Sequence, residues 1–345
     1  MPAKRSRSGS GLAAVAEYAG VSLATASRVL AGSTHRVSSD LRDRVLRAAD
    51  TLDYIPNASA RSLIAGTRKI VGVLQHDMLD SFTAANVRAL EEVADRAGWL
   101  LMLVNASGNV EKELRYLRLF RAERVGAMIL LGSGLDDDDY RAMLTRELGG
   151  YVKAGGRVAM AGRHDLAYSE YVPDNVGGAQ AAVEYLLQCG HRRIGIISSP
   201  AAIIGTRERL RGARNALERF GVPWDETLII EGDLRRESGA RACEELLARA
   251  PDITAIFAMS DEMGLGVYDV ARARGLRIPN DLSVVGYDDT VSSRDVTPQM
   301  TSVVYPNGEL ARRAIESCFS EPPPEPTQTL IPCTLVVRES VATRV

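Results

Sequence analysis

The side chains best suited to recognising a partner near the start of the chain lie in segment 22–28, Ser-Leu-Ala-Thr-Ala-Ser-Arg. Arg28 carries a planar fork of N–H donors that can bond both acceptors on the edge of a guanine, the commonest sequence-specific contact to DNA. Leu23 and Ala24 can offer only apolar contacts, for instance to thymine methyl groups. The hydroxyl groups of the segment can bond phosphate oxygens: Ser22, Thr25 and Ser27.

The sequence contains no recognisable catalytic or metal-binding pattern. It has no GxxxxGK[ST] phosphate loop, no GxSxG nucleophile elbow and no metal-spaced histidine pair. Gly264 and Gly266 lack the third glycine of a dinucleotide-binding fingerprint. The four cysteines lie far apart without a CxxC pair, so neither a zinc ribbon nor a redox motif is indicated: Cys189, Cys243, Cys318 and Cys333. We therefore expect a protein that is not an enzyme and holds neither a cofactor nor a metal.

The distribution of charge favours a DNA-binding segment at the start of the chain. The 345 residues carry a net charge of only −2, which by itself argues against a nucleic-acid partner. Residues 1–69, however, hold 11 Lys and Arg against 5 Asp and Glu, and the rest of the chain is net acidic. A basic N-terminal segment followed by an acidic remainder is typical of a segment that binds nucleic-acid phosphates. The alternative is that the charges follow a chance pattern on solvent-exposed helices.

Composition and length place the chain among water-soluble proteins of two or three domains. Hydrophobic residues make up 46% and charged residues 25%, the usual balance of a globular protein with a sizeable core. No apolar stretch approaches the roughly 20 residues that span a bilayer. The N-terminal MPAKRSRSGSG is not followed by the apolar core of a secretion signal. These features predict a cytoplasmic protein without a membrane partner.

Three short helices are predicted after a flexible basic arm at residues 1–10. The first spans residues 12–19 and ends at Gly20, and the second begins at the N-cap Ser22 and runs to Gly32. The third follows Ser38. Two helices joined by a tight turn that contains glycine form a helix-turn-helix, and the second helix would carry the base-reading side chains. We expect this head at 11–56, and a short hinge helix capped by Asn57, with a linker, at 57–69.

Beyond the linker, predicted strands and helices alternate, which is typical of parallel sheets covered by helices. Because about 270 residues of this pattern is long for one sheet, two similar lobes are expected, with ligands bound in the cleft at the carboxyl ends of the strands. The strands are predicted at 70–74, 100–104, 127–131, 157–161, 194–198, 228–231, 255–258 and 283–286. The intervening helices include 83–97, 177–187, 207–220, 238–250 and 263–274.

Several motifs, spread in order over nearly the whole chain, resemble the lactose-repressor (LacI/GalR) family of bacterial transcriptional regulators. They lie at residues 13–33, 54–63, 174–177 (DNVG), 190–195 (GHRRIG), 209–212 (RLRG) and 285–289 (VGYDD). The resemblance implies an all-α helix-turn-helix head, a hinge helix and a two-lobed α/β core like that of type I periplasmic binding proteins. The chain would cross between the lobes three times, with the first lobe at 70–187 plus 302–326 and the second at 188–301 plus 327–345.

The resemblance also assigns DNA-contacting residues. The family's base-reading positions fall on Leu23, Ala24 and Arg28, while Ser22, Thr25 and Ser27 would position the helix on phosphates. Leu63 occupies the place where the family inserts a leucine into the minor groove, and such a wedge kinks the duplex. Alternatively, Leu63 packs the head against the core.

A second set of residues is implied to contact a small effector. Arg209 and Asp288 match the family's effector-contacting arginine and aspartate, a pair suited to vicinal sugar hydroxyls, although the pair could also be purely structural. Asp80 and Phe82 stand at the place of the family's Asn-Pro-Phe, and Phe82 could instead belong to the core. Ser260 replaces the asparagine that many relatives carry. Asp174 is either a pocket-rim residue or a helix cap.

The sequence therefore predicts a DNA-binding transcriptional regulator, a repressor, whose operator affinity depends on a small molecule bound between the lobes. The effector is expected to be a sugar, and the protein a homodimer on a partly palindromic operator. The alternatives are a sugar-binding protein without a DNA role and a regulator that responds to a purine or sugar phosphate as corepressor. An α/β enzyme that uses a nucleotide is disfavoured by the missing phosphate loop.

Overall fold

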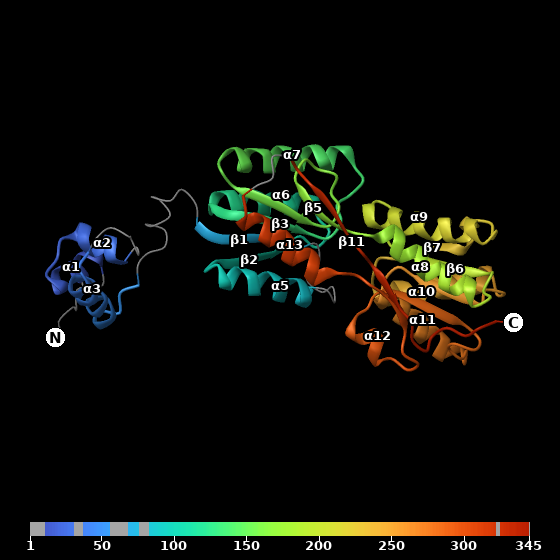
Figure 1. Cartoon of the computed structure of the whole chain (residues 1–345). Helices are drawn as coiled ribbons and strands as arrows, with labels where there is room; N and C mark the ends of the chain where they lie inside the picture. The colour runs from blue at the N-terminus through green and yellow to red at the C-terminus, as the bar shows by residue number, and fades with distance from the viewer. Residues whose placement is uncertain (1–10, 31–36, 56–67, 76–82, 322–324, 345) are drawn as a thin grey trace, which may run out of the picture. The chain divides into compact units, whose positions relative to one another are not determined.

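The computed structural model describes residues 11–30, 37–55, 68–75, 83–321 and 325–344, and the chain divides into two compact units, residues 1–68 and 69–345 (Figure 1). The expected hinge helix, with Asn57 and Leu63, lies outside the described residues, as do Asp80 and Phe82. No described helix is both long and apolar enough to cross a lipid bilayer.

The first unit contains the three predicted helices: α1 (Leu12–Ala19), α2 (Leu23–Leu30) and α3 (Ser39–Thr51). Helix α1 ends at Gly20, which adopts the left-handed conformation (φ +62°) that glycine tolerates best. The hydroxyl of Ser22 accepts a hydrogen bond from the Thr25 amide (3.1 Å), and the hydroxyl of Ser38 accepts one from the Leu41 amide (3.4 Å). The predicted N-cap Ser22 is therefore confirmed, and the third helix follows Ser38 as predicted.

The second unit contains two six-stranded sheets, and the predicted two-lobed α/β core is confirmed. The first sheet has the strand order β11-β5-β4-β3-β1-β2. Helices cover both of its faces, with α5 and α13 on one and α6 and α7 on the other (Figure 1). Its elements are β1 (Arg68–Gln75), α5 (Thr83–Arg96), β2 (Leu100–Asn105), α6 (Val110–Ala122), β3 (Val125–Leu131), α7 (Asp138–Lys153), β4 (Arg157–Ala161), β5 (Ser169–Pro173), α13 (Asn307–Phe319) and β11 (Gln328–Ile331).

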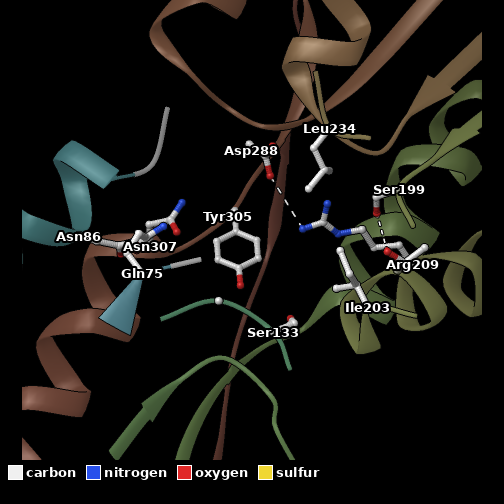
Figure 2. Close-up of a pocket in the computed structure, with 13 residues that line it drawn as sticks. Gln75, Asn86, Ser133, Ser199, Ile203, Arg209, Leu234, Asp288, Tyr305 and Asn307 are labelled. Atoms are coloured by element: carbon white, nitrogen blue, oxygen red, sulfur yellow. Dashed lines mark hydrogen bonds and ion pairs between the residues drawn. The ribbon is translucent and has the colours of Figure 1, made fainter. Parts of the chain in front are cut away.

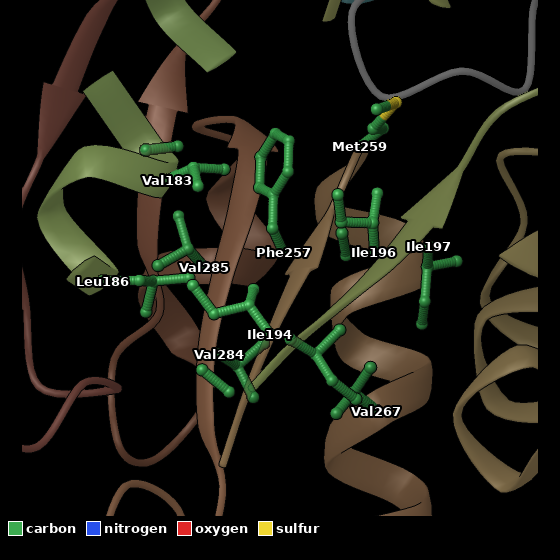
Figure 3. Packing of buried hydrophobic residues seen from close by; sticks show 14 of the residues in the cluster. Val183, Leu186, Ile194, Ile196, Ile197, Phe257, Met259, Val267, Val284 and Val285 are labelled. Atoms are coloured by element: carbon green, nitrogen blue, oxygen red, sulfur yellow. The ribbon is translucent and has the colours of Figure 1, made fainter. Parts of the chain in front are cut away.

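The second sheet has the order β12-β10-β9-β8-β6-β7, in which the edge strand β12 runs antiparallel to β10 and the other neighbouring strands run parallel. Its central strands are apolar on both faces, as Figure 3 shows for Ile194, Ile196 and Val284, because helices cover both sides. The elements are α8 (Asn175–Gln188), β6 (Ile194–Ser198), α9 (Ile204–Arg219), the 3₁₀ turn η1 (Glu226–Leu228), β7 (Ile229–Glu231), α10 (Arg236–Arg249), β8 (Ala255–Ala258), α11 (Asp261–Arg274), β9 (Ser283–Asp288), α12 (Val291–Asp295), β10 (Thr301–Val304) and β12 (Thr334–Val336).

The structure corrects the lobe boundaries predicted from the sequence. Helix α8 packs its small apolar face into the core of the second sheet, so the first crossing lies near Asp174 rather than at residues 187–188. Strand β10 belongs wholly to the second sheet, and β11 pairs with β5 in the first. The other crossings therefore lie near Tyr305 and Pro332 instead of at 301–302 and 326–327. We call 69–173 plus 306–331 the first lobe and 174–304 plus 333–344 the second lobe.

Gly212 of α9 packs directly against the backbone of α8, and its substitution is expected to destabilise the second lobe. A Cβ atom at Gly212 would lie 2.2 Å from the carbonyl oxygen of Val176, a backbone atom that cannot move without shifting the helix. Gly212→Ala is expected to lower the free energy of unfolding by about 2–3 kcal/mol in urea titrations. Gly149→Ala, in the helix α7, is the matched control: its Cβ would meet nothing within 4 Å, so stability should rise by up to about 1 kcal/mol. An unchanged Gly212→Ala protein would contradict this account of the packing.

Candidate functional site

Helix α2 presents the polar and apolar groups that the sequence indicated for base contacts. Ser22, Leu23, Ala24 and Arg28 are exposed, while Thr25 and Ser27 are half-buried. The side chain of Leu23 is 54% exposed, so it contributes little to the core of the head. The opposite face of the helix, Ala26 and Val29, is buried against α1 and α3. The helix therefore holds a rigid exposed face for an external partner.

The turn between α1 and α2 is held by the third helix. Arg44 of α3 donates a hydrogen bond from Nη2 to the carbonyl oxygen of Ala19 (2.5 Å), the last residue of α1. The amide of Val21 donates to the carbonyl of Ala16 (2.9 Å). Because a basic side chain at a helix C-terminus satisfies otherwise unpaired carbonyls, these contacts fix the angle at which α2 leaves the turn.

The second unit has a pocket at the carboxyl ends of the strands of both sheets, where ligands bind in parallel α/β folds (Figure 2). Its cavity volume is about 120 Å³. Several lining residues lie at or just after a strand end: Gln75, Gly132, Ser133, Ser199, Asp288 and Tyr305. The others come from helices or loops: Asn86, Ile203, Gly205, Thr206, Arg209, Leu234 and Asn307. Most of the polar groups are uncharged amides and hydroxyls.

Arg209 of α9 lies in this pocket with its guanidinium held on several sides. Its Nε donates to Oδ1 of Asn175 (3.1 Å), and its Nη1 donates to the carbonyl oxygen of Met259 (2.5 Å). Its Nη2 lies 3.8 Å from Oδ1 of Asp288, an ion pair that Figure 2 marks with a dashed line. The guanidinium carbon lies 3.7 Å from the centre of the Tyr287 ring, within the range of a cation–π contact.

The electrostatics of the pocket keep this arginine charged and the nearby phenols neutral. Burial by itself would lower the pKa of Arg209, but Tyr287 and Asp288 favour the cation, and its pKa is raised overall. Burial raises the pKa of Tyr287 and of Tyr305 well above the usual value for tyrosine. One positive and one negative side chain thus face the pocket together.

Asp288 adopts an unusual backbone conformation, with φ +116°. Few residues other than glycine adopt such angles, and they do so mainly at functional sites. The loop that follows is anchored by Asp261, the first residue of α11, whose carboxylate accepts hydrogen bonds from the Thr290 amide (2.7 Å) and the Ser302 hydroxyl (2.6 Å). Burial raises the pKa of Asp261 to about 6. Since the Asp289 amide also bonds the Ser302 hydroxyl (3.1 Å), this buried network fixes the backbone directly after Asp288.

Two other predicted effector residues lie outside the pocket lining and act as helix caps. The side chain of Asp174 accepts a hydrogen bond from the Gly177 amide (2.8 Å) at the start of α8. The side chain of Ser260 accepts one from the Met263 amide (3.2 Å) at the start of α11 and is 4% exposed. For Asp174 the structure shows the helix cap, which was the alternative reading of this residue.

The pocket includes residues that the sequence analysis did not name, chiefly Gln75, Ser133, Ser199, Tyr305 and Asn307. The signal that could have found Gln75 and Ser199 was the position directly after a predicted strand, whereas no strand was predicted before Tyr305 or Asn307. Among the described residues, no group of three or more His, Cys, Asp or Glu side chains is arranged to hold a metal ion. The arrangement can bind a polar, mainly uncharged molecule through donors and acceptors on several sides.

Comparison with known proteins matches both units. Residues 12–57 match the family model described as bacterial regulatory proteins, lacI family, and residues 183–341 match a periplasmic binding protein-like domain. The transcriptional regulator CelR of Thermobifida fusca is 36% identical over 335 residues, which cover 94% of this chain and 96% of CelR. GalR of Escherichia coli is 34% identical over 333 residues, with 95% of each chain covered.

Two solved structures are similar over nearly the whole chain. A complex of CelR with cellobiose gives a TM-score of 0.71 at 33% identity, and a Lac repressor dimer bound to operator and the anti-inducer ONPF gives 0.84 at 27% identity. Each alignment covers 96% of this chain and 99% of the other. The similarity thus extends over the head and the two-lobed core alike.

Proposed function

Because the chain belongs to the LacI family of bacterial regulatory proteins, we propose that it is a homodimeric repressor whose affinity for a partly palindromic operator is set by a sugar bound in the pocket. Two-fold symmetry of a dimer matches the symmetry of such a site, and the similar Lac repressor structure is a dimer on its operator. The protein acts in the cytoplasm, where its DNA lies, and performs no catalysis of its own.

The exposed face of α2 supports the DNA-binding half of this proposal. Arg28 reads a guanine, Leu23 and Ala24 contact methyl groups, and the hydroxyls of Ser22, Thr25 and Ser27 bond phosphates. Asn57 caps a hinge helix and Leu63 wedges between base steps in the minor groove. Phosphate contacts provide much of the binding free energy, so affinity falls steeply with salt.

The charge balance around Arg209 is the observation that carries the choice of ligand. Its guanidinium already has Asp288 as a partner, and the other polar lining groups are neutral. A neutral sugar can bridge the two charges with its hydroxyls, whereas a phosphate group would meet the carboxylate of Asp288. Asp80 and Phe82 are proposed to complete the site. Asp174 and Ser260 act on it through the helices that they cap.

A thermal-shift screen of the full chain tests this ligand class. A molecule that binds only the folded protein raises the melting temperature by mass action. At a concentration of one hundred times its Kd, it adds about 2.7 kcal/mol to the free energy of unfolding. Cellobiose, ribose and other neutral sugars are compared with sugar phosphates and purines. A shift with a neutral sugar is expected. A shift with a sugar phosphate or a purine alone would overturn the choice and favour the corepressor alternative.

A further inference from the structure

We propose that Glu208 is a positioning residue that connects the contact between the two lobes to Arg209, through an ion pair with Arg163 and a hydrogen bond to Asn175. The proposal rests on the pocket function proposed above and adds the path by which ligand occupancy is transmitted to the lobes. Glu208 lines no part of the pocket, so its role would be indirect.

The two lobes contact each other through backbone hydrogen bonds beside the pocket. Residues 134–136 of the first lobe run antiparallel to residues 202–204 of the second, and we call this contact the lobe bridge. The Asp136 amide donates to the carbonyl of Ala202 (2.8 Å), and the Ile204 amide donates to the carbonyl of Gly134 (3.1 Å). Two hydrogen bonds between short loops are a weak connection that side chains can stabilise or release.

Two ion pairs support the lobe bridge, and one of them is largely shielded from water. Nε of Arg163 in the first lobe lies 2.7 Å from Oε1 of Glu208 in the second, with side-chain exposures of 23% and 10%. The other pair joins Asp136 to Arg207, whose side chain is 61% exposed. Because water screens exposed pairs strongly, the Arg163–Glu208 pair is the one expected to matter for the contact.

The second oxygen of Glu208 leads directly to the ligand-binding arginine. Oε2 accepts a hydrogen bond from Nδ2 of Asn175 (2.9 Å), and Oδ1 of the same amide accepts from Nε of Arg209 (3.1 Å). Both ends of the Asn175 amide are therefore engaged, which fixes its orientation. A continuous path of polar contacts runs from Arg163 in the first lobe through Glu208 and Asn175 to Arg209.

The path links two events that a regulator must connect. A sugar that bonds Arg209 shifts its guanidinium relative to Asn175, and this shift changes the position of Glu208 opposite Arg163. By linkage, a change in the lobe contact must alter ligand affinity by the same factor. Glu208 thus connects occupancy of the pocket to the lobe bridge without touching the ligand.

Hydrogen exchange in the ligand-free full chain tests the inference without knowledge of the ligand or the operator. Peptides covering the amides of Asp136 and Ile204 report the lobe bridge from each side. Arg163→Met and Glu208→Gln are each expected to accelerate exchange about tenfold at both amides, including the one in the other lobe. The exchange rate of the double variant should exceed that of the slower-exchanging single variant by no more than about threefold, because both substitutions break the same interaction. Arg163→Lys, which keeps the cation, should restore much of the protection.

Glu147→Gln is the matched control. Glu147 has a side-chain exposure of 8% and bonds Arg118 and Arg121, but all three lie within the first lobe. This variant should leave exchange at the lobe bridge unchanged. Equal acceleration by Glu147→Gln, or no acceleration by Arg163→Met and Glu208→Gln, would overturn the role of the ion pair.

Asn175→Ala tests the inner part of the path. It should accelerate exchange at the Asp136 amide about threefold, although Glu208, Arg209 and Tyr287, to which the Asn175 side chain is hydrogen-bonded, all lie within the second lobe. Unchanged exchange would overturn the connection to Arg209. A wild-type protein that shows no thermal shift with cellobiose or any other sugar would count against the proposed function, while the exchange results would still decide the path.

Discussion

Replacing Arg28 with alanine is expected to reduce sharply the preference of the protein for its operator over random DNA. A paired hydrogen bond from arginine to guanine contributes about 1–3 kcal/mol of discrimination, and a dimer makes it twice, so specific affinity should fall by at least about 30-fold. The side chain is exposed on α2, so the fold should be unaffected. Competition binding to genomic fragments selected by the wild-type protein, measured at fixed salt, gives the ratio of specific to random affinity.

Arg88→Ala is the control for the loss of one positive charge. Arg88 lies on α5 in the first lobe, far along the chain from the head, and its side chain is 82% exposed beside Glu92. Its removal should leave the ratio unchanged. The Arg28 variant should also keep the salt-dependent binding to random DNA that phosphate contacts provide. A variant that still selects the same fragments would contradict the base-reading role of Arg28.

Asp288→Asn is expected to remove the sugar response while operator binding survives. Asparagine tolerates positive φ better than most residues, so the backbone at φ +116° is preserved. The loss of the carboxylate leaves the buried Arg209 cation without its opposite charge and removes an acceptor for sugar hydroxyls. A hydrogen bond to a charged group contributes about 1.5–3 kcal/mol, so the loss of this acceptor should lower sugar affinity by at least about 10-fold.

The sugar response is measured as the change in operator affinity when the sugar that shifts the wild-type melting temperature is added. Asp269→Asn is the matched control, because Asp269 in the same lobe pairs with Arg236 on the surface, with exposures of 40% and 43%. It should keep the full response. An Asp288→Asn protein that responds at the same sugar concentration would show that the carboxylate does not contact the ligand.

The head could be predicted from the sequence almost residue by residue, because local signals determine its helices. Gly20 ends α1, Ser22 caps α2, and α3 begins directly after Ser38, as expected. The apolar residues Ala26 and Val29 lie three positions apart on α2, on one face of the helix, and both are buried. Such signals act within a few residues of each other and do not depend on the rest of the fold.

The core was less predictable where burial does not depend on apolar residues. Thr301 and Ser302 of β10 are fully buried, but their hydroxyls bond the Arg338 amide and Asp261, so no hydrophobic pattern marked the strand. Helix α8 belongs to the second lobe because it packs against α9 and the second sheet, and the local sequence of the helix does not encode these contacts. The predicted pair Arg209–Asp288 does meet in the pocket, whereas the part of Asn175 in holding Arg209 could be seen only in three dimensions.

The three crossings between lobes have a consequence for the order in which the protein is made. Strand β11 completes the edge of the first sheet beside β5, and α13 covers one face of it, yet both follow almost the entire second lobe along the chain. Because the ribosome synthesises the chain from the N-terminus, α13 and β11 are added to the first lobe only after almost all of the second lobe has been synthesised. Until then, the β5 edge and the apolar surface under α13 remain uncovered. Chaperones that bind nascent chains are expected to bind the first lobe while α13 and β11 are still missing.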